Sequence, residues 1–347
     1  MQFLERFLLT LVLLGTLVVG GALFYGVSFQ QGVALDTPKS PVPLERTVLP
    51  EQPSVISGFL SKLSLFPFIG RGERSLVAVI VENHEQARLY HQGLRDAVLI
   101  QEYLVEGLIS RFVVFFDVRR LPIQVGPVRS LRPYFLDGAL PITHVIYHAG
   151  GSPEALERAQ NDSAITALNG LYYSDHFLRA DNIPAPHNLF IVKDRIEDLL
   201  PENLTTTLWP PYETGTVRSG ERARVIHVNF HNPVHDVLYE YQVTSRRYIR
   251  TNGGIVSEAQ PRNVLILEVP INGEGEFGRL DITVRGQGRV LLFQSGVVIP
   301  GRWRKAGEES PFVFEDANGD PLRFASGLTW MTVLPTLERV TWIEEEL

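Results

Sequence analysis

The feature that most constrains this chain is an uncharged, apolar run near its start, from Phe7 to Phe29. As a helix this run would be roughly 34 Å long at about 1.5 Å per residue, which is enough to cross a hydrocarbon core of about 30 Å. Its apolar character continues around the whole helix, unlike a helix packed on a core by one face. We therefore expect residues 1–29 to be a membrane anchor, with the membrane as a partner through residues 7–29.

A cleaved signal peptide is the alternative, because Gly32-Val33-Ala34 resembles a small-x-small cleavage site. The apolar run is, however, longer than the usual core of a signal peptide, about 7–15 residues. Arg6 precedes the run, and Lys39 and Arg46 follow it, so charge orients the span weakly. Together with the short N-terminal tail, this favours a single-pass protein of the cell membrane whose folded body lies outside the cytoplasm.

Residues 30–74 are expected to form a Pro-rich tether, since six prolines fall between Pro38 and Pro67. The first domain, residues 75–205, is expected to be an α/β layered structure, because short apolar runs alternate with helical patterns. The expected strands are 76–81, 112–116, 143–147 and 189–192, and the expected helices are 96–108, 131–140, 153–159 and 194–200.

Proline and glycine mark residues 206–224 as a linker. Beyond it, short apolar runs are separated by turn signals such as Asn252-Gly253-Gly254 and Asn272-Gly273. Residues 225–347 are therefore expected to form a mostly β second domain. The fold class of the whole chain is α+β, with an N-terminal transmembrane helix.

Composition excludes several functions. A net charge of −7 and a pI near 5.8 argue against a nucleic-acid partner. The chain has no cysteine, so it has no disulfide, thiolate metal site or cysteine nucleophile. His227, His231 and His235 have the i, i+4 spacing of zinc ligands on a helix, but their surroundings alternate as in a strand, where residues four apart are about 13 Å apart. We predict no metal and no cofactor.

Polar residues concentrate between Gly126 and Leu156. Arg129 and Arg132, three residues apart at an expected helix start, would lie on one face and suit a carboxylate or phosphate. The alternative is pairing with internal acids, such as Glu102, Glu106 or Asp137. Gly150-Gly151-Ser152-Pro153 follows a strand and opens a helix, with Ser152 suited to the N-cap. Free amides at such a turn favour anions, although an ordinary strand–turn–helix joint has the same pattern.

Other candidates lie near strand ends. His148 and His187 could each act as a general base, Ser152 as a nucleophile and Glu82 as an assisting carboxylate. A lone histidine is more often a structural hydrogen-bonding group. The predicted ligand-binding set is Arg129, Arg132, His148, Gly150, Gly151, Ser152, His187 and Asn188.

These motifs resemble the YerB-like bacterial family, a two-domain group of unknown function. The matching segments are 81–84, Glu102 with 106–107 and 111–112, 126–134, 148–153, 186–189, 263–264, 301–303 and 327–330. The resemblance implies a membrane-held protein outside the cytoplasm. Many members look like lipoproteins anchored through a cysteine, which this chain lacks, so Phe7–Phe29 would supply the anchor.

Three functions remain open. The first is a membrane-anchored binding protein for a polar or anionic ligand, a cell-envelope component or a protein partner. The second is an envelope-associated hydrolase or transferase that uses His148 or His187 as its base. The third is a structural interaction protein, in which the polar residues form a buried network.

Overall fold

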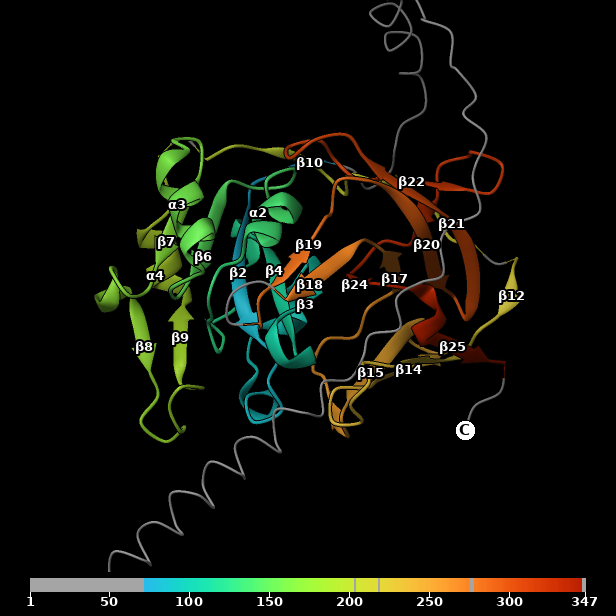
Figure 1. Ribbon diagram of the computed structural model, residues 1–347, viewed down its shortest axis with the longest axis horizontal. Coiled ribbons are helices and arrows are strands. Elements are labelled where there is room, and N and C mark those ends of the chain that lie inside the picture. The colour runs from blue at the N-terminus through green and yellow to red at the C-terminus, as the bar shows by residue number, and fades with distance from the viewer. Residues whose placement is uncertain (1–71, 203, 218, 275–277, 345–347) are drawn as a thin grey trace, which may run out of the picture. The chain divides into compact units, whose positions relative to one another are not determined.

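The computed structural model describes residues 72–344 except 203, 218 and 275–277 (Figure 1). Within these ranges, no helix is long and apolar enough to cross a membrane. The expected anchor at 1–29 and most of the expected tether lie outside them. The last residues of that tether, Gly72–Arg74, form strand β1, which pairs with β10 (Thr207–Trp209).

One mixed sheet forms the centre of the described chain. Its spatial order is β12 (Glu221–Arg222), β21 (Val297–Lys305), β20 (Gly286–Gln294), β17 (Asn263–Glu268), β24 (Thr329–Leu334), β3 (Leu99–Leu104), β4 (Ser110–Asp117), β2 (Leu76–Glu82), β6 (Val145–His148) and β7 (Thr166–Asn169), with β22 (Val313–Asp316) paired to β21. The parallel pairing of β24 with β3 joins the two halves of the sequence in a continuous sheet.

Smaller sheets flank this one. A five-stranded sheet contains β16 (Ile255–Val256), β15 (Arg247–Asn252), β14 (Val237–Gln242), β13 (Val225–Val228) and β25 (Val340–Ile343). A three-stranded sheet contains β5 (Gln124–Val125), β9 (Leu189–Val192) and β8 (Phe177–Arg179), and two-stranded pairs join β11 (Glu213–Thr214) to β23 (Arg323–Phe324) and β18 (Ile271–Glu274) to β19 (Leu280–Ile282).

Helices are few and short. Those in the described residues are α2 (Pro133–Ala139), α3 (Pro153–Asn161) and α4 (Lys193–Asp198), with several single 3-10 turns. The α/β alternation expected of the first domain is therefore limited to the region after residue 133. The expected helix at 96–108 is wrong: this segment contains β3, all of whose residues are buried.

The expected linker at 206–224 contributes strands to three sheets: β10, β11 and β12. Trp209 and Tyr212 anchor it, because both side chains are buried in the core. Proline and glycine identified the turns of this segment, but its buried aromatic residues attach it to the fold.

The core is continuous across both halves. β2, β3, β4, β17 and β24 supply fully buried aliphatic and aromatic side chains to one cluster. Since β2, β3, β6 and β7 run in the same direction, their carboxyl ends lie along one edge of the sheet. Glu82, His148 and Asn169 stand at these ends, which is where ligand sites of such sheets usually form.

Candidate functional site

The segment before α2 is extended rather than helical. Arg129 N–H donates to Ile80 O, and Ala149 N–H donates to Arg129 O, so the segment is inserted between β2 and the end of β6. Arg132 is the N-cap of α2 and has β-type φ and ψ angles. Residues three apart in an extended segment point to opposite faces. The prediction that Arg129 and Arg132 share a helix face is therefore wrong.

The two arginines bind different acids. Arg129 Nη2 lies 2.6 Å from Glu82 Oε1. Arg132 donates from Nε to Glu106 Oε1 at 2.9 Å. The alternative of pairing with an internal acid thus describes Arg132 correctly, and Glu106 was among the acids considered. The pKa of Glu106 is lowered from its ordinary value. Burial alone would raise this pKa, but the hydrogen bonds to the carboxylate and the charge of Arg132 outweigh the effect of burial.

Glu82 is the centre of a buried cluster. Its Oε2 lies 2.9 Å from Nδ1 of His187, whose Nε2 lies 3.2 Å from Gln86 Oε1. The ring of His84 stacks on that of His187, with 5.3 Å between centroids. Both ring nitrogens of His187 therefore lie within hydrogen-bonding distance of a neighbouring side chain. In this arrangement His187 orients Glu82, and both of its nitrogens are occupied by contacts within the cluster.

His148 is enclosed at the end of β6. Its Nδ1–H donates to Gly150 O at 2.7 Å, while Nε2 is buried and has no hydrogen-bond partner in the described part of the chain. Burial lowers the pKa of His148, so the ring is neutral at pH 7. Gly150 has φ +68°, which favours glycine, and its N–H donates to Asn169. Asn188 bonds Arg179 and Ala180 instead of this turn.

Ser152 is a helix cap. Its Oγ accepts the N–H of Ala155, and Pro153 occupies the first position of α3. Among the described residues, no hydrogen bond joins Ser152 to a histidine. The serine–histidine pair considered for catalysis is therefore not formed in this structure.

Arg132 and Ser152 nevertheless line a common pocket of about 300 Å³. It is bounded by α2 and α3 on one side and by the region of β19 on the other. The lining residues are Arg132, Pro133, Tyr134, Asp137, Ser152, Glu154, Arg158, Arg279, Leu280, Asp281, Ile282, Thr283 and Arg285. We call this the arginine pocket, because four arginines and three carboxylates line it.

Arginines of the pocket form ion pairs with nearby acids. Arg158 bridges Asp137 at 2.6 Å and Glu308 at 2.9 Å. Arg285 Nη1 lies 3.0 Å from Glu308, and both of these side chains are about half exposed. Such exposed pairs contribute little stability, so an incoming anion can replace their carboxylates at small cost.

A second polar centre was missed by the sequence predictions. Glu102, which is fully buried in β3, lies 2.8 Å from Arg250 Nη2 and accepts the N–H of Trp330 at 2.8 Å. Arg88 reaches across to the other half of the chain, where it donates to Val234 O and contacts His235. Glu102 was considered only as part of a family motif and as a possible partner of Arg129 or Arg132, because the sequence does not show which distant arginine a buried acid meets.

The histidines with zinc-like spacing have separate partners. His235 Nδ1 lies 2.7 Å from Arg88 Nη2, whereas His227 pairs with Asp236. Within the described ranges, no group of three or more histidine, aspartate or glutamate side chains is arranged to hold a metal ion.

Fold and site together define a two-domain, mostly β protein with few helices. Two family models match the chain: the N-terminal domain of a protein of unknown function (DUF3048) at residues 70–206, and its C-terminal domain at 226–331. The chain belongs to this YerB-like family.

Two relatives are informative. The chain is 30% identical over 283 residues to the Bacillus subtilis (strain 168) protein named "Putative lipoprotein YerB", covering 77% of this chain and 83% of that protein. The crystal structure of the YerB protein from Bacillus subtilis superposes with a TM-score of 0.69 at 30% identity, covering 78% of this chain and 93% of the other. The family resemblance seen in the sequence is confirmed.

Proposed function

We propose that this protein is held at the outer side of the cell membrane and binds an anionic group of a cell-envelope component in the arginine pocket. The observation that carries the proposal is the pocket itself, which Arg132 and Ser152 line together with Arg158, Arg279 and Arg285. Arginine suits carboxylate and phosphate groups, because its planar fork donates two parallel hydrogen bonds.

Positive charge near the pocket supports this choice of ligand. Arg111 donates to Ser130 O beside Arg132. Burial and the repulsion of Arg132 lower the pKa of Arg111 to about 10. The nearby carboxylate of Glu106 offsets only part of this repulsion. A bound anion would relieve it further.

The membrane location is supported by two observations. Phe7–Phe29 has the length and composition of a membrane span. The Bacillus relative is named as a lipoprotein, a class attached to a membrane by lipid, and this chain has no cysteine for such an attachment. We propose that the apolar span replaces the lipid.

The binding proposal is favoured over catalysis by His148 or His187. His148 Nε2 is enclosed, and both nitrogens of His187 are hydrogen bonded. A general base needs an unoccupied nitrogen within reach of its substrate, and neither ring offers one in this arrangement.

The test is co-sedimentation of the purified full-length protein with insoluble cell-wall sacculi, either intact or stripped of their phosphate polymers. Loss of a charge-assisted hydrogen bond costs about 1.5–3 kcal/mol, so Arg132→Gln with Arg285→Gln should weaken binding at least about tenfold. Loss of binding on stripping identifies phosphate as the ligand group, and retention identifies the wall carboxylates.

The matched control is Arg289→Gln with Arg304→Gln. These arginines are exposed and paired with acids, like Arg285, but they do not line the pocket. The control should bind within about twofold of the unmodified protein. Equal binding by both double variants, with unchanged thermal stability, would refute the proposed role of the pocket.

A further inference from the structure

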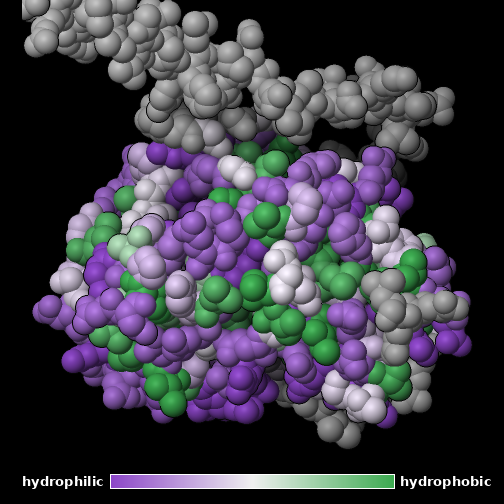
Figure 2. All heavy atoms as spheres, turned by 90° about the horizontal axis from the view of Figure 1, so that it is seen from below, coloured by the Kyte–Doolittle hydropathy of each residue, from purple (hydrophilic) through white to green (hydrophobic). Residues whose placement is uncertain are grey.

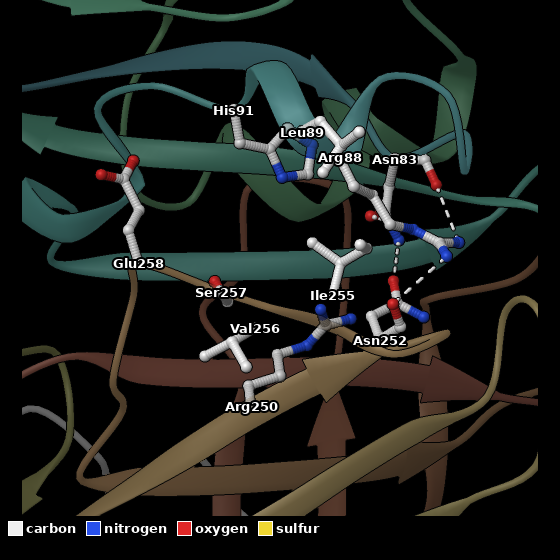
Figure 3. A pocket seen from close by; sticks show the side chains of 10 residues that line it. All are labelled: Asn83, Arg88, Leu89, His91, Arg250, Asn252, Ile255, Val256, Ser257 and Glu258. Atoms are coloured by element: carbon white, nitrogen blue, oxygen red, sulfur yellow. Dashed lines mark hydrogen bonds between the residues drawn. The ribbon is translucent and has the colours of Figure 1, made fainter.

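A second pocket, of about 220 Å³, lies between the loop that follows β2 and the β15–β16 hairpin (Figure 3). It is lined by Asn83, Arg88, Leu89, His91, Arg250, Asn252, Ile255, Val256, Ser257 and Glu258, none of which lines the arginine pocket. It is smaller than the sites of drug-sized ligands, which measure about 300–1,000 Å³. Its ligand must therefore be small. We call it the hairpin pocket.

Arg250 supplies a donor at the base of this pocket. The residue is only 2% exposed, its Nη2 pairs with Glu102, and its guanidinium lies 4.2 Å from the ring centroid of Trp330. Nη1 has no hydrogen bond in the described part of the chain, and it is not fully enclosed by protein. Figure 3 shows the end of this side chain directed toward Ile255 and the pocket interior. The free N–H groups therefore face the cavity.

His91 supplies an acceptor. Its Nε2 lies 2.6 Å from Glu82 O, so this nitrogen carries the proton and Nδ1 is left with a lone pair. Burial lowers the pKa of His91 to about 4, which keeps the ring neutral at pH 7. Within the described ranges, Nδ1 has no hydrogen bond. A ligand N–H in the pocket would complete this ring.

The two ends of the pocket differ in charge. Glu258 lies at the end opposite Arg88 and Asn252 (Figure 3), and its Oε1 is held by the N–H of Leu94 at 2.8 Å. Arg88, at the other end, is 5% exposed and, among the described residues, contacts amide, carbonyl and imidazole groups but no carboxylate. The pocket thus has a cationic end and an anionic end.

Apolar side chains form the rim. Leu89 is 69% exposed and Val256 is 62% exposed, and the side chain of Ile255 points from the hairpin toward Leu89 (Figure 3). The loop after β2 and β15 reach the lower side of the molecule in Figure 1, which is the face that Figure 2 shows. That face is mainly hydrophilic, with separate apolar patches across its middle (Figure 2). Apolar surface beside a polar cavity suits a ligand with one apolar group.

We propose that the hairpin pocket binds a free α-amino acid with an apolar side chain. Arg250 Nη1 would bind the carboxylate, and His91 Nδ1 and Glu258 would bind the ammonium group. The side chain would pack against Leu89 and Val256. This arrangement satisfies the free donor, the free acceptor and the anionic end with one small zwitterion.

Isothermal titration of the purified full-length protein with three probes tests the proposal. Leucine should bind, leucinamide should bind at least about tenfold more weakly because it lacks the carboxylate, and N-acetylleucine should lose at least about fivefold because it lacks the ammonium group. Equal binding of leucine and leucinamide overturns the role of Arg250. Equal binding of leucine and N-acetylleucine overturns the zwitterion, and so does the absence of leucine binding at millimolar concentration.

Glu258→Gln keeps an oxygen for the Leu94 N–H and removes the charge, so folding is preserved. This variant should bind leucine several-fold more weakly and N-acetylleucine unchanged. Its control is Glu315→Gln, since Glu315 is similarly exposed, also lies near an arginine and does not line the pocket. If the two variants bind leucine alike, the assignment of Glu258 is wrong.

Discussion

Replacing Glu102 with glutamine should destabilise the whole fold. The side chain is fully buried and accepts from four groups: Arg250, the hydroxyl of Ser110 at 2.6 Å, the indole of Trp330 and the hydroxyl of Thr332 at 3.3 Å. Glutamine replaces one acceptor oxygen with an NH₂ donor. At least one surrounding donor would then face another donor.

The magnitude follows from the charge left behind. Arg250 is 2% exposed and has no other carboxylate among its hydrogen-bond partners. Breaking a buried ion pair from one side costs about 3–5 kcal/mol. At typical urea slopes of about 1–3 kcal/mol per molar, the unfolding midpoint should fall by roughly 1–5 M.

Urea unfolding followed by tryptophan fluorescence measures this effect, and Trp330 reports directly because its indole donates to Glu102. Glu102→Leu with Arg250→Met should recover much of the loss, since apolar residues can replace a buried pair at little cost. Glu315→Gln, which breaks the exposed pair with Arg304, should cost less than about 1 kcal/mol. A Glu102→Gln loss as small as that of Glu315→Gln would refute the reasoning.

Two further predictions concern stability. Burial lowers the pKa of His91 from 6.5 to about 4 in the folded protein, so the unfolded chain takes up this proton first as pH falls. The contribution of His91 to the free energy of unfolding is therefore complete above pH 6.5 and is lost as pH falls toward 4. The lowered pKa corresponds to roughly 3 kcal/mol at about 1.4 kcal/mol per unit, and partial exposure of the ring reduces this free energy to about 1–2 kcal/mol. His91→Asn should remove this pH-dependent contribution from urea midpoints measured at pH 7, 5.5 and 4.5. A variant with an unchanged pH profile would contradict the prediction. Gly126 has φ +153°, and an added Cβ would lie 2.7 Å from the ring of Phe190, so Gly126→Ala should cost about 2–4 kcal/mol. Gly254→Ala, with φ +82° but open space around it, should cost only about 1–2 kcal/mol in the same denaturation assay, and equal losses would show that contact with Phe190 is unimportant.

Local patterns predicted many elements of this fold. The helix at Pro153 was recognised from its serine cap and its proline, and β2 and β9 from apolar runs bounded by polar residues. The segment containing β3 was mistaken for a helix because Gln101 and Glu102 interrupt its apolar residues. Both are buried, and each has a partner distant in sequence, Gly138 for Gln101 and Arg250 for Glu102, so a local pattern cannot distinguish them from surface positions.

The candidate site was predicted in part. The sequence identified Arg132 and Ser152, which line one pocket, and Glu82, Arg129 and His187, which form one cluster. It could not show that these are separate places, because an extended segment sends Arg129 and Arg132 to opposite faces. The hairpin pocket was missed because its lining comes from two segments more than a hundred residues apart.

The parallel pairing of β3 with β24 also sets an order of events during synthesis. β3 is complete once residue 104 has left the ribosome, but its neighbour begins only at residue 329. Until then one side of β3 has no partner from β24, and the backbone groups there remain available to any strand that meets them. The nascent chain therefore has to remain without its final sheet until nearly all of it has been made. Its first half is not a unit that can be completed and then left alone.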